Sequence, residues 1–248
     1  MRIGIDVGGT HTDAVILNGD DVIAATKALT SADVVSGITN ALDTLLNDGA
    51  VKQSQIETVM IGTTQFTNAI IERRELAPVA AVRICLPSGR GLPPMVDWPE
   101  DIATAIGRQH YLLKGGYLYD GWPVADMDDA EVDAMIADLV VSGVKNIAIA
   151  SAFSPMNADP EKYVAKKILR AIPDAKVTLS HNFGRLGLME RENAAILNTT
   201  LLPFAEKVIS SFLKALTNRG LTCPVYISQN DGTLMSADFV SAYPALTF

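Results

Sequence analysis

The first thirty residues contain three strand-like segments joined by glycine turns, and this beginning constrains the fold more than any other feature. The segments cover 2–7, 13–17 and 21–29, and their connections read "VGGT" and "NGDD". Short glycine-containing connections of this kind are typical of β-hairpins. The sequence therefore predicts three consecutive antiparallel strands.

The rest of the chain alternates between helical and strand periodicity. Ser31 or Asp33 is the expected cap of a helix with an apolar face at 34–46, and Gly49 is its expected end. Next come predicted strands at 56–62 and 77–86, with a polar cap and a short helix between them. An antiparallel start followed by alternating strands and helices predicts an α/β fold with a mixed sheet and flanking helices.

The second part of the chain continues this alternation. Its predicted strands are 146–153, 175–180 and 223–228, and a loop is expected at 229–236. Three helices are predicted. The first has an Asp128–Glu131 capping box and ends at Gly143, and the second has Asp159 as its cap and Pro160 in first position. The third is long, from about Glu190 to Arg219, and is expected to be kinked near Pro203.

The same pattern suggests where the chain divides. Residues 1–180 contain enough strands and helices for one compact domain. We expect 181–248 to hold a long connecting helix and the beginning of a second domain. The residues after Gly232 are too few to complete another α/β layer, so we expect the second half of the fold to be incomplete in this chain.

Composition and charge exclude several classes of partner. The 248 residues are 48% hydrophobic and carry a formal net charge of −8, which is unfavourable for binding nucleic acid or an anionic membrane. No apolar run approaches the length of a membrane span, and no signal peptide is evident, so we expect a cytoplasmic protein. Cys85 and Cys223 are expected to be reduced core thiols, and the three scattered histidines do not indicate a zinc site.

The first glycine turn combines hydroxyl and carboxyl side chains with the glycine pair: Asp6, Gly8, Gly9, Thr10, Thr12 and Asp13. Two glycines allow close approach of a ligand and positive φ, so several N–H groups could converge on an anion, with the threonines adding hydroxyl donors. The two aspartates could hold a hydrated Mg²⁺ or orient a water. An ordinary hairpin with a Gly-Gly turn explains the same residues equally well.

Three further clusters are candidates for a binding cleft: Thr63, Thr64 and Asn68; Glu190, Arg191 and Asn193; and Asp231 with Gly232. The first cluster precedes or opens a helix, whose N–H groups suit an anion, but threonines there also act as simple caps. Acidic residues at a helix start are expected from the helix dipole alone. Asp231 and Gly232 are also consistent with a type I′ turn.

Several stretches together are similar to one family. The pattern Asp-x-Gly-Gly-Thr-x-Thr-Asp resembles the first phosphate loop of the actin-like (ribonuclease H-like) ATPase superfamily and, more narrowly, of the hydantoinase A/5-oxoprolinase family. The stretches "IGTTQFTNAIIERR", "IGRQHYLLKGGY", "MERENAAILNTTLLP" and "SQNDGTLMS" resemble other elements of that family, in the same order. His11 stands where the family usually has an aromatic residue. The family's second phosphate loop and adenosine-binding stretch have no counterpart here.

The resemblance implies an N-terminal, actin-like portion of an enzyme that opens a cyclic amide at the expense of ATP, through a phosphorylated lactam that water attacks. It implies phosphate binding by Gly8, Gly9, Thr10 and Thr12, and catalytic roles for Asp6 and Asp13. Asp6 would bind Mg²⁺ through water, so the implied cofactors are ATP and Mg²⁺. The three other clusters would line a substrate cleft between the domains.

The implied partners are a small lactam, and a second subunit or the missing C-terminal half. We also expect a homo-oligomer, and no substantial ATPase or lactamase activity from this chain alone. Two other functions remain open. One is a sugar or acyl kinase of the same superfamily, and the other is a non-catalytic subunit that binds nucleotide.

Overall fold

The computed structural model describes residues 1–29, 34–47 and 51–247. These residues form two compact units. Unit 1 consists of Met1–Glu72 and Pro203–Phe248, and unit 2 of Arg73–Leu202. These units are defined by contacts between residues, and unit 1 combines both ends of the chain. The division into 1–180 and 181–248 that the sequence predicts is defined by order along the chain, and it stays a prediction.

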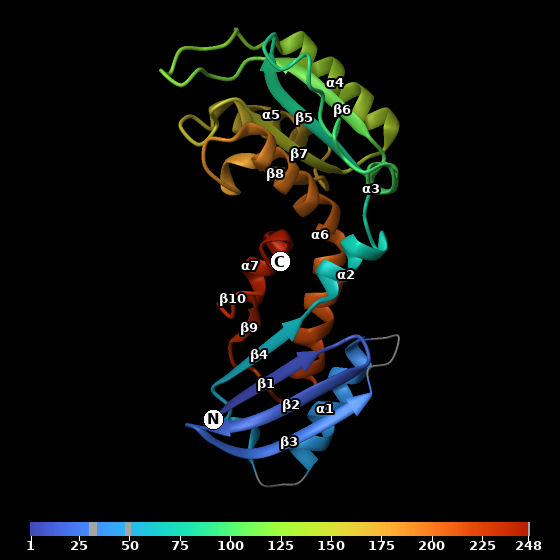
Figure 1. Cartoon of the computed structure of the whole chain (residues 1–248), viewed down its shortest axis with the longest axis vertical. Helices are drawn as coiled ribbons and strands as arrows, with labels where there is room; N and C mark the ends of the chain where they lie inside the picture. Colours follow the sequence, from blue (N-terminus) through green and yellow to red (C-terminus); the bar gives the residue numbers. More distant parts are fainter. Residues whose placement is uncertain (30–33, 48–50, 248) are drawn as a thin grey trace. The chain divides into compact units, whose positions relative to one another are not determined.

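Unit 1 is built on a six-stranded mixed sheet in the order β10-β9-β4-β1-β2-β3 (Figure 1). Its strands are β1 (Arg2–Val7), β2 (His11–Asn18), β3 (Asp21–Leu29), β4 (Thr58–Thr63), β9 (Val225–Ser228) and β10 (Leu234–Ser236). The first three strands are antiparallel, as predicted. β4 lies parallel to β1 on one side and to β9 on the other, so the carboxyl ends of these three strands meet at one edge.

Alternating side chains decide which face of this sheet is buried. Ile3, Ile5 and Val7 of β1 are buried, whereas Asp6 is exposed on the opposite face. Helix α1 (Val34–Asn47) packs against β2 and β3 and buries Ile38 and Leu42. The helix exists as predicted, but its expected caps, Ser31 and Asp33, and its expected end, Gly49, lie outside the described residues.

The remaining elements of unit 1 are short, apart from the second half of a long helix. They are η1 (Gln53–Gln55), α2 (Gln65–Glu72), α7 (Ala237–Ala242), η3 (Pro244–Thr247) and the C-terminal part of α6 (Leu188–Thr217). α6 is the predicted long helix and Pro203 lies inside it, whereas the kink expected there stays a prediction. The Phe66 ring of α2 meets the Phe204 ring of α6 edge-on, with 5.8 Å between centroids. The loop expected at 229–236 is partly wrong, because its last residues form β10 and pair with β9.

Unit 2 contains a four-stranded, fully parallel sheet in the order β6-β5-β7-β8. Its strands are β5 (Val79–Leu86), β6 (Gln109–Lys114), β7 (Asn146–Ser151) and β8 (Lys176–Leu179). Its helices are α3 (Glu100–Ile106), α4 (Asp129–Ser142), α5 (Asp159–Ala171), η2 (Ser180–Asn182) and the start of α6. One sheet face packs on α4 and α5 and the other on α3 and α6. Burial on both faces explains why β5 is apolar almost throughout.

Helix ends in unit 2 partly match the expectations. The Asp128 carboxylate caps α4 by accepting from the Ala130 N–H at 3.0 Å, and Gly143 ends the helix in a left-handed conformation. The capping box is wrong, because the Glu131 carboxylate pairs with Lys114 at 2.7 Å instead. Asp159 is the first residue of α5 rather than its cap, and the Asn157 side chain accepts from the Asp159 N–H at 2.9 Å.

No helix within the described ranges is long and apolar enough to span a membrane. Both cysteines are free, and Cys85 is buried within β5.

Candidate functional site

Three polar residues and a glycine, from four neighbouring strands, form one row across the sheet of unit 1. Asp6 of β1 pairs in register with Asp13 of β2 and with Gly62 of β4. Ser228 of β9 follows Ile227, which pairs with Ile61 of β4, so Ser228 extends the same row. The row lies near the carboxyl ends of β1, β4 and β9, which is where ligands bind in open α/β sheets.

Gly62 is the residue of this row that has no side chain. A Cβ atom at this position would lie 3.1 Å from Asp6 Oδ1 and 3.3 Å from Ser228 Oγ. Such distances are tighter than ordinary van der Waals contacts, so any larger residue would displace the carboxylate or the hydroxyl. The absence of a side chain at Gly62 therefore leaves a small space bordered by two polar oxygens.

The two aspartates of the row differ in their surroundings. The Asp13 carboxylate forms an ion pair with Lys27 Nζ of β3, 3.2 Å from Oδ1. Within the described part of the chain, the Asp6 carboxylate has no hydrogen-bond or ion-pair partner. Asp6 is therefore the carboxylate of this row that is available to a ligand.

The loop between β1 and β2 is held by its own backbone. The Gly8 N–H donates to the His11 carbonyl oxygen at 3.0 Å, and a Cβ on Gly8 would lie 3.0 Å from the same oxygen. A Cβ on Gly9 would meet nothing within 4 Å. Neither glycine has a positive φ, so that part of the sequence argument is wrong. Gly8 is needed for close approach, and Gly9 leaves its side of the loop open.

The threonines of the loop lie on different sides of the structure. Thr10 is exposed, and its hydroxyl lies 3.2 Å from His11 Nδ1. Thr12 is 0% exposed and shares the core face with Ala14 and Ile16. The structure therefore does not bring the Thr12 hydroxyl to the face that carries Asp6.

Thr63, Thr64 and Asn68 contact one another at the start of α2. The Thr63 hydroxyl accepts from the Gln65 N–H at 3.3 Å. The Asn68 side chain donates to the Thr64 hydroxyl at 3.3 Å, and its backbone N–H donates to the Thr64 carbonyl at 2.8 Å. These contacts stabilise the first turn of the helix, directly after the strand that carries Gly62.

Asp231 and Gly232 form the turn between β9 and β10. The Gly232 N–H donates to the Gln229 carbonyl at 3.1 Å, and Gly232 alone has a positive φ (+83°) in this turn. This combination is a type I turn followed by a left-handed glycine, so the type I′ assignment is wrong. The Asp231 carboxylate accepts from the Thr233 hydroxyl at 2.7 Å and from its N–H, and these hydrogen bonds lower the pKa of Asp231.

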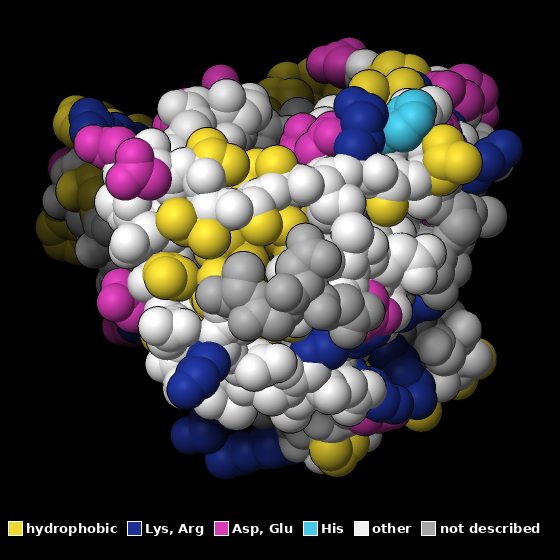
Figure 2. Space-filling model, turned by 90° about the horizontal axis from the view of Figure 1, so that it is seen from below, with side chains coloured by type: hydrophobic (Ala, Val, Ile, Leu, Met, Phe, Trp, Pro, Cys, Tyr) yellow, Lys and Arg dark blue, Asp and Glu magenta, His cyan; other side chains and the backbone are white. Residues whose placement is uncertain are grey.

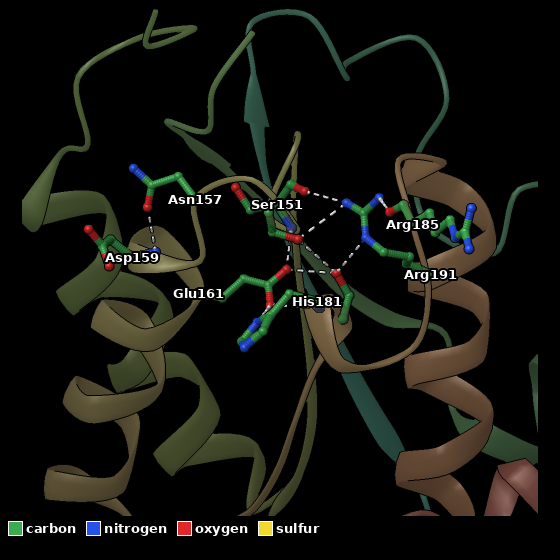
Figure 3. Close-up of polar contacts among 9 residues, drawn as sticks. Ser151, Asn157, Asp159, Glu161, His181, Arg185 and Arg191 are labelled. Carbon is green, nitrogen blue, oxygen red and sulfur yellow. Dashed lines mark hydrogen bonds and ion pairs between the residues drawn. The ribbon is translucent and has the colours of Figure 1, made fainter. Parts of the chain in front are cut away.

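Arg191 lies in unit 2, inside a buried polar network (Figure 3). Its side chain is 2% exposed. The two terminal nitrogens of its guanidinium donate to the carbonyls of Arg185, Gly187 and Ser151, each at 2.8 Å, and to the Ser154 hydroxyl. All its donors are therefore engaged by the chain itself.

The buried Glu161 carboxylate is the acidic centre of this network (Figure 3). It accepts from the Ser151 N–H at 2.9 Å, the Ser180 hydroxyl at 2.6 Å and His181 Nδ1 at 2.6 Å. Because Arg191 Nε also contacts the Ser180 hydroxyl, at 3.4 Å, the network joins the start of α6 to the ends of β7 and β8.

The neighbours of Arg191 on α6 have different surroundings. Glu190 is exposed, and its carboxylate lies over Gly187. The Asn193 side chain accepts from Trp98 Nε1 at 3.0 Å. Within unit 2, Glu190 is therefore exposed to solvent, Arg191 lies in the buried polar network, and Asn193 is bonded to Trp98.

The donor set at Asp6 is compatible with a hydrated Mg²⁺. Among the described residues, no group of three or more His, Cys, Asp or Glu side chains is arranged to hold a metal. Mg²⁺ does not require such a group, because it keeps several waters and is often held by one or two carboxylates together with phosphate oxygens. The Asp6 carboxylate beside an open space, with the Ser228 hydroxyl on its other side, fits this requirement.

Sequence reasoning missed two features of the molecule. Ser228 was not singled out, because a lone serine at a strand end has no diagnostic pattern. Its position after a predicted buried strand was the available signal. Glu161 was not singled out either, because the network around it depends on contacts with residues outside its own helix.

The mixed sheet, with its glycine loop after the first strand and Asp6 beside it, places the protein in the actin-like α/β class, as expected. The chain belongs to the hydantoinase/oxoprolinase family, since residues 2–172 match the profile described as "Hydantoinase/oxoprolinase N-terminal region".

Relatives and solved structures agree with this assignment. The chain is 23% identical over 251 residues to the caprolactamase subunit alpha of Pseudomonas jessenii, covering 94% of this chain and 36% of that protein. It is 22% identical over 270 residues to an uncharacterized protein of Methanocaldococcus jannaschii, covering 98% of this chain and 37% of the relative. The chain thus spans little more than a third of the length of these relatives.

Two solved structures share the fold over 99% of this chain and 38% of theirs. One is a nucleotide-free acetone carboxylase, with a TM-score of 0.78 and 18% identity. The other is the ATP-dependent caprolactamase of Pseudomonas jessenii, with a TM-score of 0.77 and 21% identity.

Proposed function

We propose that this chain is the phosphate-binding portion of an ATP-dependent hydrolase of cyclic amides. The observation that carries the proposal is the position of Asp6, an available carboxylate beside the Gly8–Gly9 loop at the carboxyl edge of a mixed sheet. Membership of the hydantoinase/oxoprolinase family supports the reaction class.

Phosphate binding is assigned to the loop between β1 and β2. The open side of Gly9 allows a phosphate oxygen to approach the backbone N–H groups of the loop, and the exposed Thr10 hydroxyl adds a donor. Thr12 supports the loop from the core side. A Mg²⁺ held through water at Asp6 would neutralise charge on the phosphate oxygens.

The proposed substrate is a small lactam. An amide oxygen is a poor leaving group, and its phosphorylation makes the adjacent carbon open to attack by water. We assign the remaining candidate residues of unit 1 to this substrate: Thr63, Thr64, Asn68, Asp231 and Gly232. The buried Arg191 would act through the loops that it holds, rather than by contact.

We also propose that the chain works in a larger assembly. Its relatives are longer, and one of them is a subunit of its enzyme. Figure 2, which looks onto the end of unit 1 that carries β3, shows hydrophobic side chains gathered on this face. The edge strand β3 exposes Val22, Ile23 and Leu29, and such an edge supports association with a second copy.

Calorimetry with ATP·Mg²⁺ tests the binding proposal. The chain should bind the nucleotide, and Asp6→Asn should weaken binding at least about tenfold because a ligand to the hydrated cation is lost. Asp20→Asn, in the turn between β2 and β3, is the matched control and should bind as the parent does. Equal affinity for the parent and Asp6→Asn contradicts the proposal.

Turnover tests the reaction class. The chain alone should show no ATP-dependent ring opening above an Asp6→Ala control. The larger assembly that we propose, supplied with a hydantoin, 5-oxoproline or caprolactam, should release the open-chain product and phosphate, detected by mass spectrometry. Transfer of phosphate to a hydroxyl compound instead would identify a kinase.

A further inference from the structure

The space above Gly62 is bordered by two polar oxygens that lack partners. Asp6 Oδ1 and Ser228 Oγ lie 3.1 and 3.3 Å from the point that a Gly62 Cβ would occupy, and the Ile5 carbonyl oxygen lies 3.8 Å from it. Among the residues that the structure describes, neither the Asp6 carboxylate nor the Ser228 hydroxyl has a hydrogen-bond partner. One small molecule above Gly62 can therefore reach both groups.

We propose that a single water molecule binds between Asp6 and Ser228 above Gly62, and that Ser228 is a positioning residue of the phosphate site. The functional part of this inference rests on the proposed function. A carboxylate only accepts hydrogen bonds, whereas a hydroxyl both donates and accepts. The water therefore donates one hydrogen to Asp6, and in the arrangement that we propose it accepts the Ser228 hydrogen, so two of its four hydrogen-bonding positions are fixed.

The two fixed contacts leave the water with one hydrogen and one lone pair. These remaining positions point away from the sheet, on the face opposite α1, because the row lies on the exposed side of β1. The lone pair suits a divalent cation, and the hydrogen suits a phosphate oxygen. Ser228 thus acts on a bound ATP·Mg²⁺ through the water rather than by direct contact.

The strand register explains why this arrangement depends on three elements. Asp6 and Gly62 are in-register partners, and Ser228 is held beside Gly62 by the parallel pairing of β9 with β4. The turn after Ser228 is fixed by Gln229, whose N–H donates to the Thr233 carbonyl at 2.8 Å. Ser228 itself pairs with Leu234 of β10, and its hydroxyl lies beside Gly62 of β4, so the two neighbouring strands fix its position.

Crystal structures of the chain test the water site without nucleotide. The parent should show a solvent peak within hydrogen-bond distance of both Asp6 and Ser228, and Ser228→Ala and Gly62→Ala should lack it. Thr58→Ala removes a hydroxyl from the other end of β4, where it donates to the Pro224 carbonyl, and should keep the peak. A parent structure without the peak, or a Ser228→Ala structure that retains it, overturns the water site.

Calorimetry tests the positioning role separately. Ser228→Ala should weaken ATP·Mg²⁺ binding about threefold to tenfold, the range for one lost hydrogen bond, and Ser228→Thr should restore most of it. In the presence of EDTA the difference in ATP affinity between the parent and Ser228→Ala should become smaller, because the contact of the water with the cation is lost, whereas a merely structural loss would weaken both forms equally. Equal ATP·Mg²⁺ affinity overturns the positioning role. A parent that binds no nucleotide overturns the proposed function, while the crystal structures still decide the water site.

Discussion

Arg83 and Glu192 form a two-point ion pair in the interior of unit 2. Arg83 Nε lies 2.6 Å from Glu192 Oε2, and Nη2 lies 2.5 Å from Oε1. The two side chains are 2% and 3% exposed. Since Arg83 Nη1 also donates to the Leu92 carbonyl, the pair joins β5, the loop that follows it and the N-terminal part of α6.

Breaking this pair should destabilise unit 2. Glu192→Leu leaves a buried guanidinium without its counter-ion, which costs about 3–5 kcal/mol of unfolding free energy. Urea denaturation followed by circular dichroism measures the loss. The double variant Arg83→Met/Glu192→Leu should recover much of it, because no unpaired charge remains.

An exposed ion pair provides the control. Lys145 and Asp174 pair at 2.5 Å with more than half of each side chain exposed, so Lys145→Gln should cost less than about 1 kcal/mol. If Glu192→Leu costs no more than Lys145→Gln, the buried pair does not hold unit 2 together as described.

Replacing Arg191 should affect folding rather than ligand contact. Arg191→Lys offers three donors in place of five and cannot serve the carbonyls of Arg185, Gly187 and Ser151 together. We expect a loss of about 2–3 kcal/mol in urea denaturation, from buried acceptors left unpaired. Nucleotide affinity of the folded protein should stay unchanged. Arg185→Lys, at an exposed position, is the control, and a stable Arg191→Lys variant with weakened binding would identify Arg191 as a contact residue.

The sequence was sufficient to predict most strands and helices, because their signals are local. Apolar alternation marks β1 and β2, and the single-face apolar pattern marks α1. The three antiparallel strands follow from short glycine connections. Asp128 and Gly143 bound α4 as expected, because capping involves only a few neighbouring residues.

The positions of several polar side chains depend on long-range contacts, which the sequence patterns do not reveal. The position of Ser228 beside Asp6 follows from the register of three parallel strands, which no local pattern encodes. Likewise, Arg191 at a helix start is compatible with either solvent or burial, and it is buried because the ends of β7 and β8 supply its acceptors. The Glu131 carboxylate does not form the predicted capping box, because it pairs with Lys114 of β6 instead.

The two glycines of the phosphate loop should respond differently to substitution. Gly8→Ala places a methyl group 3.0 Å from the His11 carbonyl, so the hairpin must shift, and we expect a loss of about 1–2 kcal/mol. Gly9→Ala meets nothing within 4 Å and has no positive φ to strain, so its thermal midpoint should match the parent. Its methyl group should nevertheless obstruct phosphate and weaken ATP·Mg²⁺ binding in calorimetry. Equal melting of both variants would contradict the close approach at Gly8.

Asp43 should contribute to the pH dependence of unit 1. The Arg219 guanidinium donates to both Asp43 oxygens at 2.7 Å, and these hydrogen bonds lower the pKa of Asp43 despite the opposing effect of partial burial. Because the pKa is lower in the folded chain, the stabilisation is complete above the unfolded value of about 3.9 and is lost as pH falls through the folded value.

Since Asp43 is 48% exposed, we expect Asp43→Asn to cost less than about 1 kcal/mol near neutral pH. The difference from the parent in urea denaturation should shrink when pH is lowered from about 6 to about 3. Asp20→Asn, at a residue without an ion-pair partner in the described part of the chain, should show no such change, and a pH-independent cost of Asp43→Asn would contradict the assignment.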